Sequence, residues 1–221
     1  MAAPAYRATS FVTGTSASSA KFTVPEAAKS GDALLIWVFN DGASAMGLPT
    51  GGQTWTRLAE TQGGDQRVAG FILPNWNGTD KEFTVSWTGS FYRAGAIQAY
   101  SGCDTTKAHD ATSGENFREN GTTPATVDGL TTTVNECRLI SCVFQDEGAL
   151  IAPGSGWTER GDQADSPQVA EKNSSVEAGA QSGVTHTWQY SSGISMTLMV
   201  ALRPPQEAVA KPNRLTLLGV G

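Results

Sequence analysis

Short apolar runs, each bounded by Gly, Pro, Asn or Asp, recur along the whole chain. The strongest is residues 33–40, Ala-Leu-Leu-Ile-Trp-Val-Phe-Asn, which is too short for a free-standing helix and rich in β-branched and aromatic residues. This composition predicts a central strand that is buried on both faces. Residues 82–88 instead alternate, with Phe83, Val85 and Trp87 on one side, as a strand with one buried face does. Shorter runs predict further strands at residues 20–24, 55–60, 67–73 and 93–100.

One segment of the chain occurs twice, in similar form. Residues 30–41, Ser-Gly-Asp-Ala-Leu-Leu-Ile-Trp-Val-Phe-Asn-Asp, align without a gap on residues 135–146, Asn-Glu-Cys-Arg-Leu-Ile-Ser-Cys-Val-Phe-Gln-Asp. Each copy is followed by a Gly-rich stretch, a proline and then Trp-Thr, at Trp55 and at Trp157. An internal repeat indicates one β domain in two similar halves. The matching strands of the second half are predicted at residues 125–127, 138–145, 157–160, 168–173, 185–188 and 195–202.

Strands in matched order predict an all-β fold, a two-sheet β-sandwich of jelly-roll type built from two similar halves. The domain spans residues 1–205, with one half at about 5–105 and the other at about 120–205. Two separate small sandwiches are the alternative. A half alone would leave a large apolar strand face uncovered, so we expect the halves to share their sheets. Residues 111–124 are polar and Gly-rich, which is typical of a connecting loop.

The last stretch of the chain departs from the strand pattern. Pro204 and Pro205 end the final strand, because proline cannot continue a central ladder. Residues 206–221 therefore form an extended C-terminal arm, and they end in an apolar group. That tail either folds back onto its own sandwich or adds to a neighbouring subunit. The residues expected to make the assembly contact are Leu215, Leu217, Leu218 and Val220.

Composition narrows the class of partner. The 221 residues carry a net charge of −6 and no cluster of Lys and Arg, which argues against nucleic-acid binding. Charged residues make up 16% of the chain, below the roughly 25% of average soluble domains, and this suits strands joined by tight turns. No apolar stretch approaches a membrane span, so we expect no membrane partner, and the start lacks the pattern of a signal peptide.

Candidate chemistry is sparse. No nucleophile elbow, zinc-protease helix or phosphate-binding loop is present, so we expect no catalytic residue and no enzyme activity. His109 and His186 lack a third ligand of suitable spacing, so neither a metal nor a cofactor is expected. Asp41 and Asp146 end equivalent strands. They could face each other as a glycosidase pair does, but capping of turns through side-chain hydrogen bonds is the favoured interpretation.

The three cysteines are predicted to be reduced and structural. Cys137 and Cys142 lie on one predicted strand and point to opposite faces, so they cannot bridge each other. Cys142 takes the place that Trp37 has in the other half, which indicates a buried apolar thiol. Cys103 is the third.

Most of the tryptophans match between the halves and are expected in the core. Trp76 differs, because it lies in a Pro-Asn-Trp-Asn-Gly turn with no copy in the second half. A tryptophan exposed in a turn can stack on a sugar or anchor a protein contact. Together with Phe91 and Tyr92 in another loop, it is the candidate for carbohydrate or partner contact.

The repeated motifs carry a resemblance. Residues 31–42 read Gly-Asp-x-Leu-Leu, an apolar run and Asp-Gly; residues 153–158 end in Gly-Trp-Thr; residues 99–102 read Ala-Tyr-Ser-Gly. About residues 5–205 resemble a β-sandwich module of tailed-bacteriophage virion proteins, especially minor tail and other accessory structural proteins, with capsid decoration included. The motifs are structural turns, so they specify the fold better than the role.

The resemblance implies a non-enzymatic structural component of a virion, assembled in the host cytoplasm. Its partners would be other virion proteins and further copies of itself, in a homo-oligomer such as a trimer. The alternative function is a carbohydrate-binding module for host-surface or extracellular glycans.

Overall fold

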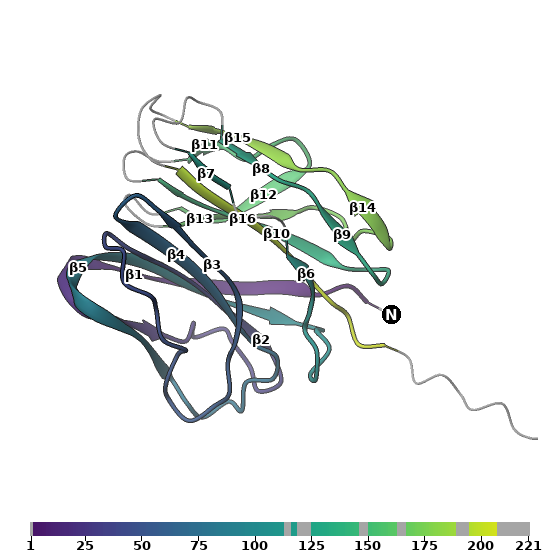
Figure 1. The fold of residues 1–221 in the computed structure, drawn as a ribbon. Helices are drawn as coiled ribbons and strands as arrows, with labels where there is room; N and C mark the ends of the chain where they lie inside the picture. Colours follow the sequence, from purple (N-terminus) through teal and green to yellow (C-terminus); the bar gives the residue numbers. More distant parts are fainter. Residues whose placement is uncertain are drawn as a thin grey trace, which may run out of the picture.

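The structure is a computed structural model, and it describes residues 2–112, 116–118, 125–145, 150–162, 167–188 and 195–206. Two main antiparallel sheets pack face to face, and further short strands cover the outer side of the second one (Figure 1). The predicted all-β sandwich is therefore confirmed. Among the described residues, no helix is long and apolar enough to cross a membrane.

The first half forms the first sheet alone. Its strands lie in the order β1-β5-β2-β4-β3, with every neighbouring pair antiparallel. The central strand is β2, which is buried along its whole length, as its apolar composition predicts. The bounds are β1 Ala5–Thr23, β2 Ala33–Asn40, β3 Thr56–Gly63, β4 Gln66–Leu73 and β5 Glu82–Ser101.

The second half repeats this order in the second sheet, β12-β13-β10-β16-β6, with β7 also paired to β16. The aligned strands β2 and β10 both lie at the centre. Residues 111–124 were expected to be a loop, but part of them pairs with β16 as β6 and β7, so that prediction is partly wrong. The bounds are β6 His109–Thr112, β7 Asn116–Arg118, β8 Ala125–Val127, β9 Leu130–Thr132, β10 Arg138–Gln145, β11 Leu150–Ala152, β12 Trp157–Gly161, β13 Gln168–Lys172, β14 Gly179–Gln181, β15 Val184–Trp188 and β16 Ser195–Leu202.

The expectation that the halves share their sheets is wrong, and the jelly-roll arrangement is not seen in the two main sheets. Each half covers the outer face of its own sheet. In the first half, β1 and β5 pass through register shifts between Gly14 and Ser19, and their far portions fold over β2. In the second half, the short pairs β15–β8 and β14–β9 contribute to the core that covers β10. The uncovered face that argued for sharing is thus buried within each half.

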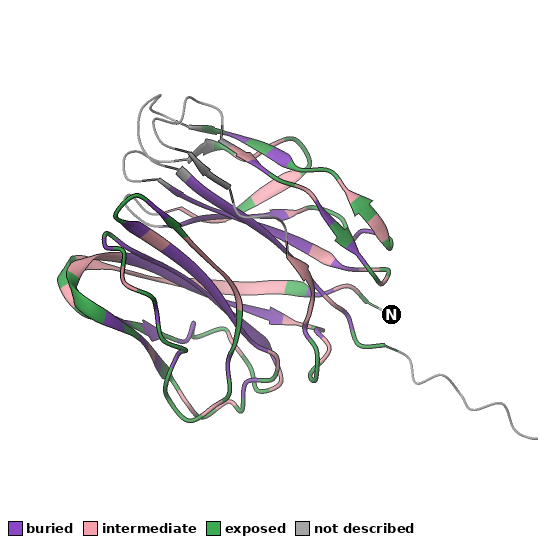
Figure 2. Ribbon diagram, in the orientation of Figure 1, coloured by how far each residue is buried: buried purple, intermediate pink, exposed green. Residues whose placement is uncertain are grey.

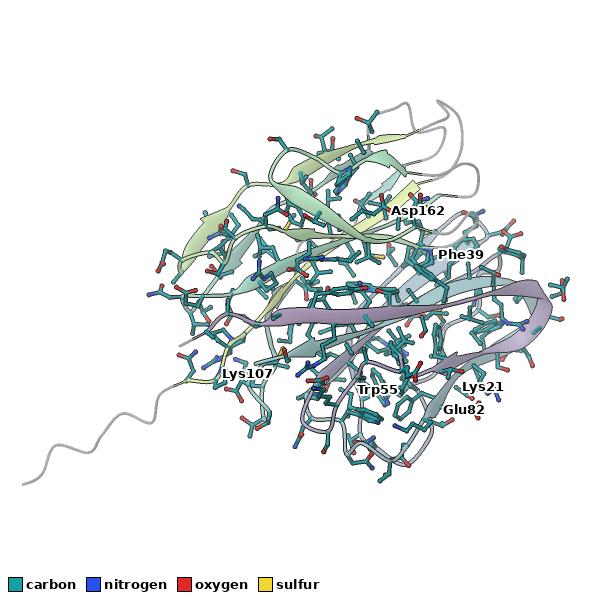
Figure 3. All side chains as sticks on the ribbon, turned by 180° about the vertical axis from the view of Figure 1, so that it is seen from behind. Lys21, Phe39, Trp55, Glu82, Lys107 and Asp162 are labelled. Carbon is teal, nitrogen blue, oxygen red and sulfur yellow. The ribbon has the colours of Figure 1, made fainter. Side chains whose placement is uncertain are left out.

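The inner faces of the two sheets meet at a core made from repeat-equivalent residues. Leu35, Trp37 and Phe39 of β2 share one cluster with Ile140, Cys142 and Phe144 of β10, which are their partners in the sequence alignment. The rings of Phe39 and Phe144 stack with their centroids 6.0 Å apart. Phe39 points into the space between the sheets in Figure 3, and Figure 2 shows the buried layer there. Contact between equivalent residues is what an approximate two-fold axis between the halves produces.

The tryptophan at this interface is accommodated by a glycine. Trp37 pairs with Gly70 on β4, where a Cβ atom would lie 3.0 Å from the indole. In the second half, Cys142 pairs instead with Val169 on β13. The first half thus pairs a large side chain with a glycine, whereas the second half pairs two side chains of intermediate size. Both combinations keep the packing dense.

Candidate functional site

Trp76 is buried, so the prediction that it is exposed in its turn is wrong. Only 1% of the residue is accessible, and its indole Nε1 donates a hydrogen bond to the Asp80 carbonyl at 2.7 Å. Its backbone exchanges hydrogen bonds with Gly31 and Asp32 at 2.8 Å each. The ammonium group of Lys81 lies 4.3 Å from the ring centroid. Trp76 closes one end of the first-half core and presents no ring face for a sugar to stack on.

Trp76 also has an equivalent in the second half, which sequence reasoning missed. Val176 exchanges backbone hydrogen bonds with Cys137 at 2.9 and 3.2 Å, and Cys137 aligns with Asp32. Val176 is itself buried in the second-half core. Each of the two side chains closes the core of its own half, at the equivalent end. No sequence signal links them, because one turn contains a proline and an aromatic residue and the other does not.

Phe91 and Tyr92 do not join Trp76 in one contact surface. Neighbouring residues of a strand point to opposite faces. Phe91 accordingly packs against the first-half core over Gly42, and Tyr92 packs against the core between the halves. Gly42 follows the end of β2, whereas Trp76 is bonded to the residue before its start. Eight residues of strand separate the two places by about 25 Å.

The other sequence candidates divide between the described residues and the rest. Asp41 accepts a hydrogen bond from the Gln66 side chain at 3.3 Å, at the end of β2. Its proposed partner Asp146 lies outside the described residues. So do the four tail residues expected to make an assembly contact, Leu215, Leu217, Leu218 and Val220.

His186 and Ser141 form a buried pair that superficially resembles a nucleophile and its base. His186 Nε2 lies 3.0 Å from Ser141 Oγ, and both residues are 1% exposed. The other ring nitrogen, Nδ1, accepts a hydrogen bond from the Gly154 backbone N–H at 3.3 Å. The single proton of a neutral imidazole therefore resides on Nε2 and is donated to the serine. A base must accept the serine proton, so this arrangement supports the fold rather than nucleophilic catalysis.

Burial makes this histidine a source of pH-dependent stability. Desolvation lowers the pKa of His186 from 6.5 to about 4 in the folded protein. Between these values the unfolded chain binds a proton that the folded chain rejects. We expect up to about 3 kcal/mol of unfolding free energy to be lost as pH falls from 7 to 4, measured by denaturant titration.

His186→Gln is expected to be less stable at neutral pH but to lose most of this pH dependence. Burial also lowers the pKa of His109, so His109→Gln is the matched control and should leave most of the slope in place. An unchanged slope in His186→Gln would contradict the assignment.

The three thiols are free and buried, as predicted. Burial raises the pKa of Cys137 to about 12 and raises that of Cys103 and Cys142 well above the ordinary value. A thiol that stays protonated is a poor nucleophile and a poor metal ligand. In the described part of the chain, no three His, Cys, Asp or Glu side chains come together as a metal would need. The His109 ring instead lies 2.6 Å from the Thr112 hydroxyl.

A buried ion network links the two halves. The carboxylate of Glu171, only 3% exposed, lies 3.4 Å from Arg138 Nε and 3.2 Å from Arg160 Nε. The Arg160 carbonyl accepts hydrogen bonds from the hydroxyls of Tyr6 and Thr9, both on β1. The ion pairs join β10, β12 and β13 within the second sheet. Contact with β1 of the other half is made by the Arg160 carbonyl and by the Arg160 guanidinium, which lies 4.8 Å from the Tyr6 ring centroid.

One pocket opens at the end of the second half, beyond the last residue of β16, and encloses about 490 Å³. Two acidic side chains, Glu136 and Glu177, contribute to its lining. Glu136 has a φ of 62°, a left-handed conformation that costs about 1–2 kcal/mol in a residue with a Cβ atom. Its repeat equivalent is Gly31, with a φ of 92°. The full lining is Thr133, Val134, Asn135, Glu136, Glu177, Ala178, Pro204 and Gln206.

Hydrogen bonds hold the rim of this pocket in place. Ser175 Oγ donates to one carboxylate oxygen of Glu136 at 2.6 Å, and the Ala178 N–H donates to the Asn135 side chain at 2.9 Å. Sequence reasoning missed the pocket, although the replacement of Gly31 by Glu136 in the repeat was a visible signal. Known proteins offer no template for its function: no family model, no curated protein and no solved structure matches this chain.

Proposed function

We propose that the protein is a structural component of a bacteriophage virion, a minor tail or capsid-surface decoration protein that acts by assembly and surface contact. The observation that carries this assignment is the place of the resemblance motifs in the fold. Residues 31–42 form the central strand and its flanking turns, residues 153–158 lead into β12, and residues 99–102 end β5. That these motifs lie in the framework of the fold supports the proposal of a structural role.

The polar groups that might have performed chemistry hold this framework together. Glu171 joins two arginines within the second sheet, and His186 donates to Ser141 in the core. Asp32 pairs with Arg7 at 2.7 Å and accepts a hydrogen bond from the Lys29 N–H. A rigid scaffold with its charges engaged internally suits a protein that works through its surface, with other virion proteins and its own copies as partners.

The carbohydrate-binding alternative loses its main support. Its principal candidate residue, Trp76, is buried, and Phe91 and Tyr92 point to different cores.

The assignment is tested on particles. Virions of the phage that encodes the chain are purified by density gradient and analysed by mass spectrometry, with immunogold labelling to distinguish tail from capsid. We expect the chain to copurify with particles at a constant ratio to the major capsid protein, while a phage replication enzyme, the control, is removed. A chain found only in the soluble fraction of the lysate would overturn the assignment.

A further inference from the structure

The acidic pocket of the second half lies where the chain leaves the sandwich. Pro204 and Gln206 form part of its lining, and residues 207–221 follow directly. The N-terminal end of the chain lies at the same end of the molecule, where Arg138 Nε donates to the Pro4 carbonyl at 3.1 Å (Figure 1). Any segment that binds in this pocket is therefore close to the root of the C-terminal arm.

In the corresponding corner of the first half, Gly78 packs closely against Ser30. Gly78 comes two residues after Trp76, as Ala178 comes two residues after Val176. A Cβ atom at Gly78 would lie 2.9 Å from the Ser30 side chain, and Ser30 Oγ donates to the Asn77 carbonyl at 3.3 Å. The duplication thus supplies an internal comparison. The repeat unit accommodates close packing at this position, and the pocket lies in the half that ends in the arm.

The chemistry of the pocket complements that of the arm. Glu136 and Glu177 supply negative charge, and Val134 and Pro204 supply apolar surface. Residues 207–221, Glu-Ala-Val-Ala-Lys-Pro-Asn-Arg-Leu-Thr-Leu-Leu-Gly-Val-Gly, carry two cations next to a run of leucines. The first residue of this segment is Glu207, whose charge opposes entry of the segment's own root into an acidic pocket.

We infer that this pocket receives the C-terminal segment, residues 207–221, of a second copy of the chain. Lys211 or Arg214 of the arriving segment faces the two glutamates, and its leucines cover the apolar lining. Pro204 and Pro205 hold their φ angles fixed, and each keeps the residue before it extended. This docking rests on the proposed assembly role, for which it specifies the two contacting parts of the chain.

Cross-linking between copies tests the docking. Full-length Ala178→Cys, at the exposed rim of the pocket, is co-expressed with a differently tagged Asn213→Cys chain and mildly oxidised. We expect a disulfide-linked species carrying both tags. Ser86→Cys, exposed on the outer side of the first half, replaces Ala178→Cys as the control and should give none.

The same pair of substitutions placed in one chain separates the two possible sources of the arm. A bridge at monomer mass in that chain, with no mixed species in the co-expression, would show that the arm docks on its own molecule and would overturn the inference. Absence of any bridge in both experiments would overturn it as well.

The charges are tested by sedimentation of the full chain over a range of concentrations. Glu136→Gln with Glu177→Gln is expected to weaken self-association by about 2- to 30-fold, the range for two partly exposed ion pairs. The control Glu26→Gln with Glu82→Gln changes the net charge equally at two exposed sites and should leave association unchanged. A parent protein that stays monomeric throughout would sink the inference. A chain that self-associates as expected but is missing from purified virions would instead count against the virion role alone.

Discussion

Replacement of Trp76 by alanine is expected to lower the free energy of unfolding by about 3–5 kcal/mol. The indole is 1% exposed and belongs to the core cluster that β2, β4 and β5 share. Its removal leaves a cavity at the end of the half and deprives the Asp80 carbonyl of its donor. Denaturant unfolding monitored by circular dichroism measures the change.

Leu48 provides the matched control, because it is 52% exposed in a loop of the same half. Leu48→Ala is expected to change stability by no more than about 0.5 kcal/mol. If Trp76→Ala lost less than about 1 kcal/mol of unfolding free energy, the burial of Trp76 would be contradicted and a contact role at the surface would again be supported. It also follows that loss of glycan binding in Trp76→Ala would measure folding instead of recognition, so a binding assay needs a different variant.

Replacement of Glu171 by alanine is expected to cost a similar amount, about 3–5 kcal/mol, for an electrostatic reason. Removal of the carboxylate leaves Arg138 and Arg160 partly buried without their counter-ion. Because the backbone carbonyl of Arg160 accepts hydrogen bonds from Tyr6 and Thr9, we expect the contact between the halves to loosen when its side chain loses its partner. Denaturant unfolding reports the loss, and hydrogen exchange at β1 and β12 locates it.

An exposed ion pair in the same molecule separates burial from charge. Lys21 and Glu82 are 2.9 Å apart, with side chains 60% and 51% exposed, at the outer side of the first half (Figure 3). Glu82→Ala is expected to cost at most about 1 kcal/mol. Equal losses in Glu82→Ala and Glu171→Ala would mean that the Glu171 network contributes no more than a surface pair.

The strands were largely predictable, because each carries its own pattern of buried positions. The continuous apolar run of β2 and the alternation of Phe83, Val85 and Trp87 both correspond to strands with the expected burial. The partition into sheets was not predictable. The pattern along a strand indicates that a face is covered, but it does not indicate which segment covers it. The bend of β1 and β5 over their own sheet depends on contacts between residues far apart in the chain.

The candidate site was likewise predictable only in part. The residues around Trp76 correctly indicated a turn, since Pro, Asn and Gly favour turns. Those neighbours do not determine whether the indole points outward, because the direction is set by the hydrogen bonds to Asp32 and Asp80. The acidic pocket was missed for a related reason. Its lining comes from three separate stretches of chain, which only the packed fold brings together.

The sequence by itself determined the all-β class, the duplication and the central place of its two aligned strands, because these depend on local periodicity and on residue identity. Only the tertiary structure decided that each half builds its own sheet, that equivalent residues such as Phe39 and Phe144 meet across an approximate two-fold axis, and that Trp76 lies inside. Such features depend on which covered face packs against which. That choice is made by the free energy of the whole core, to which distant segments contribute together.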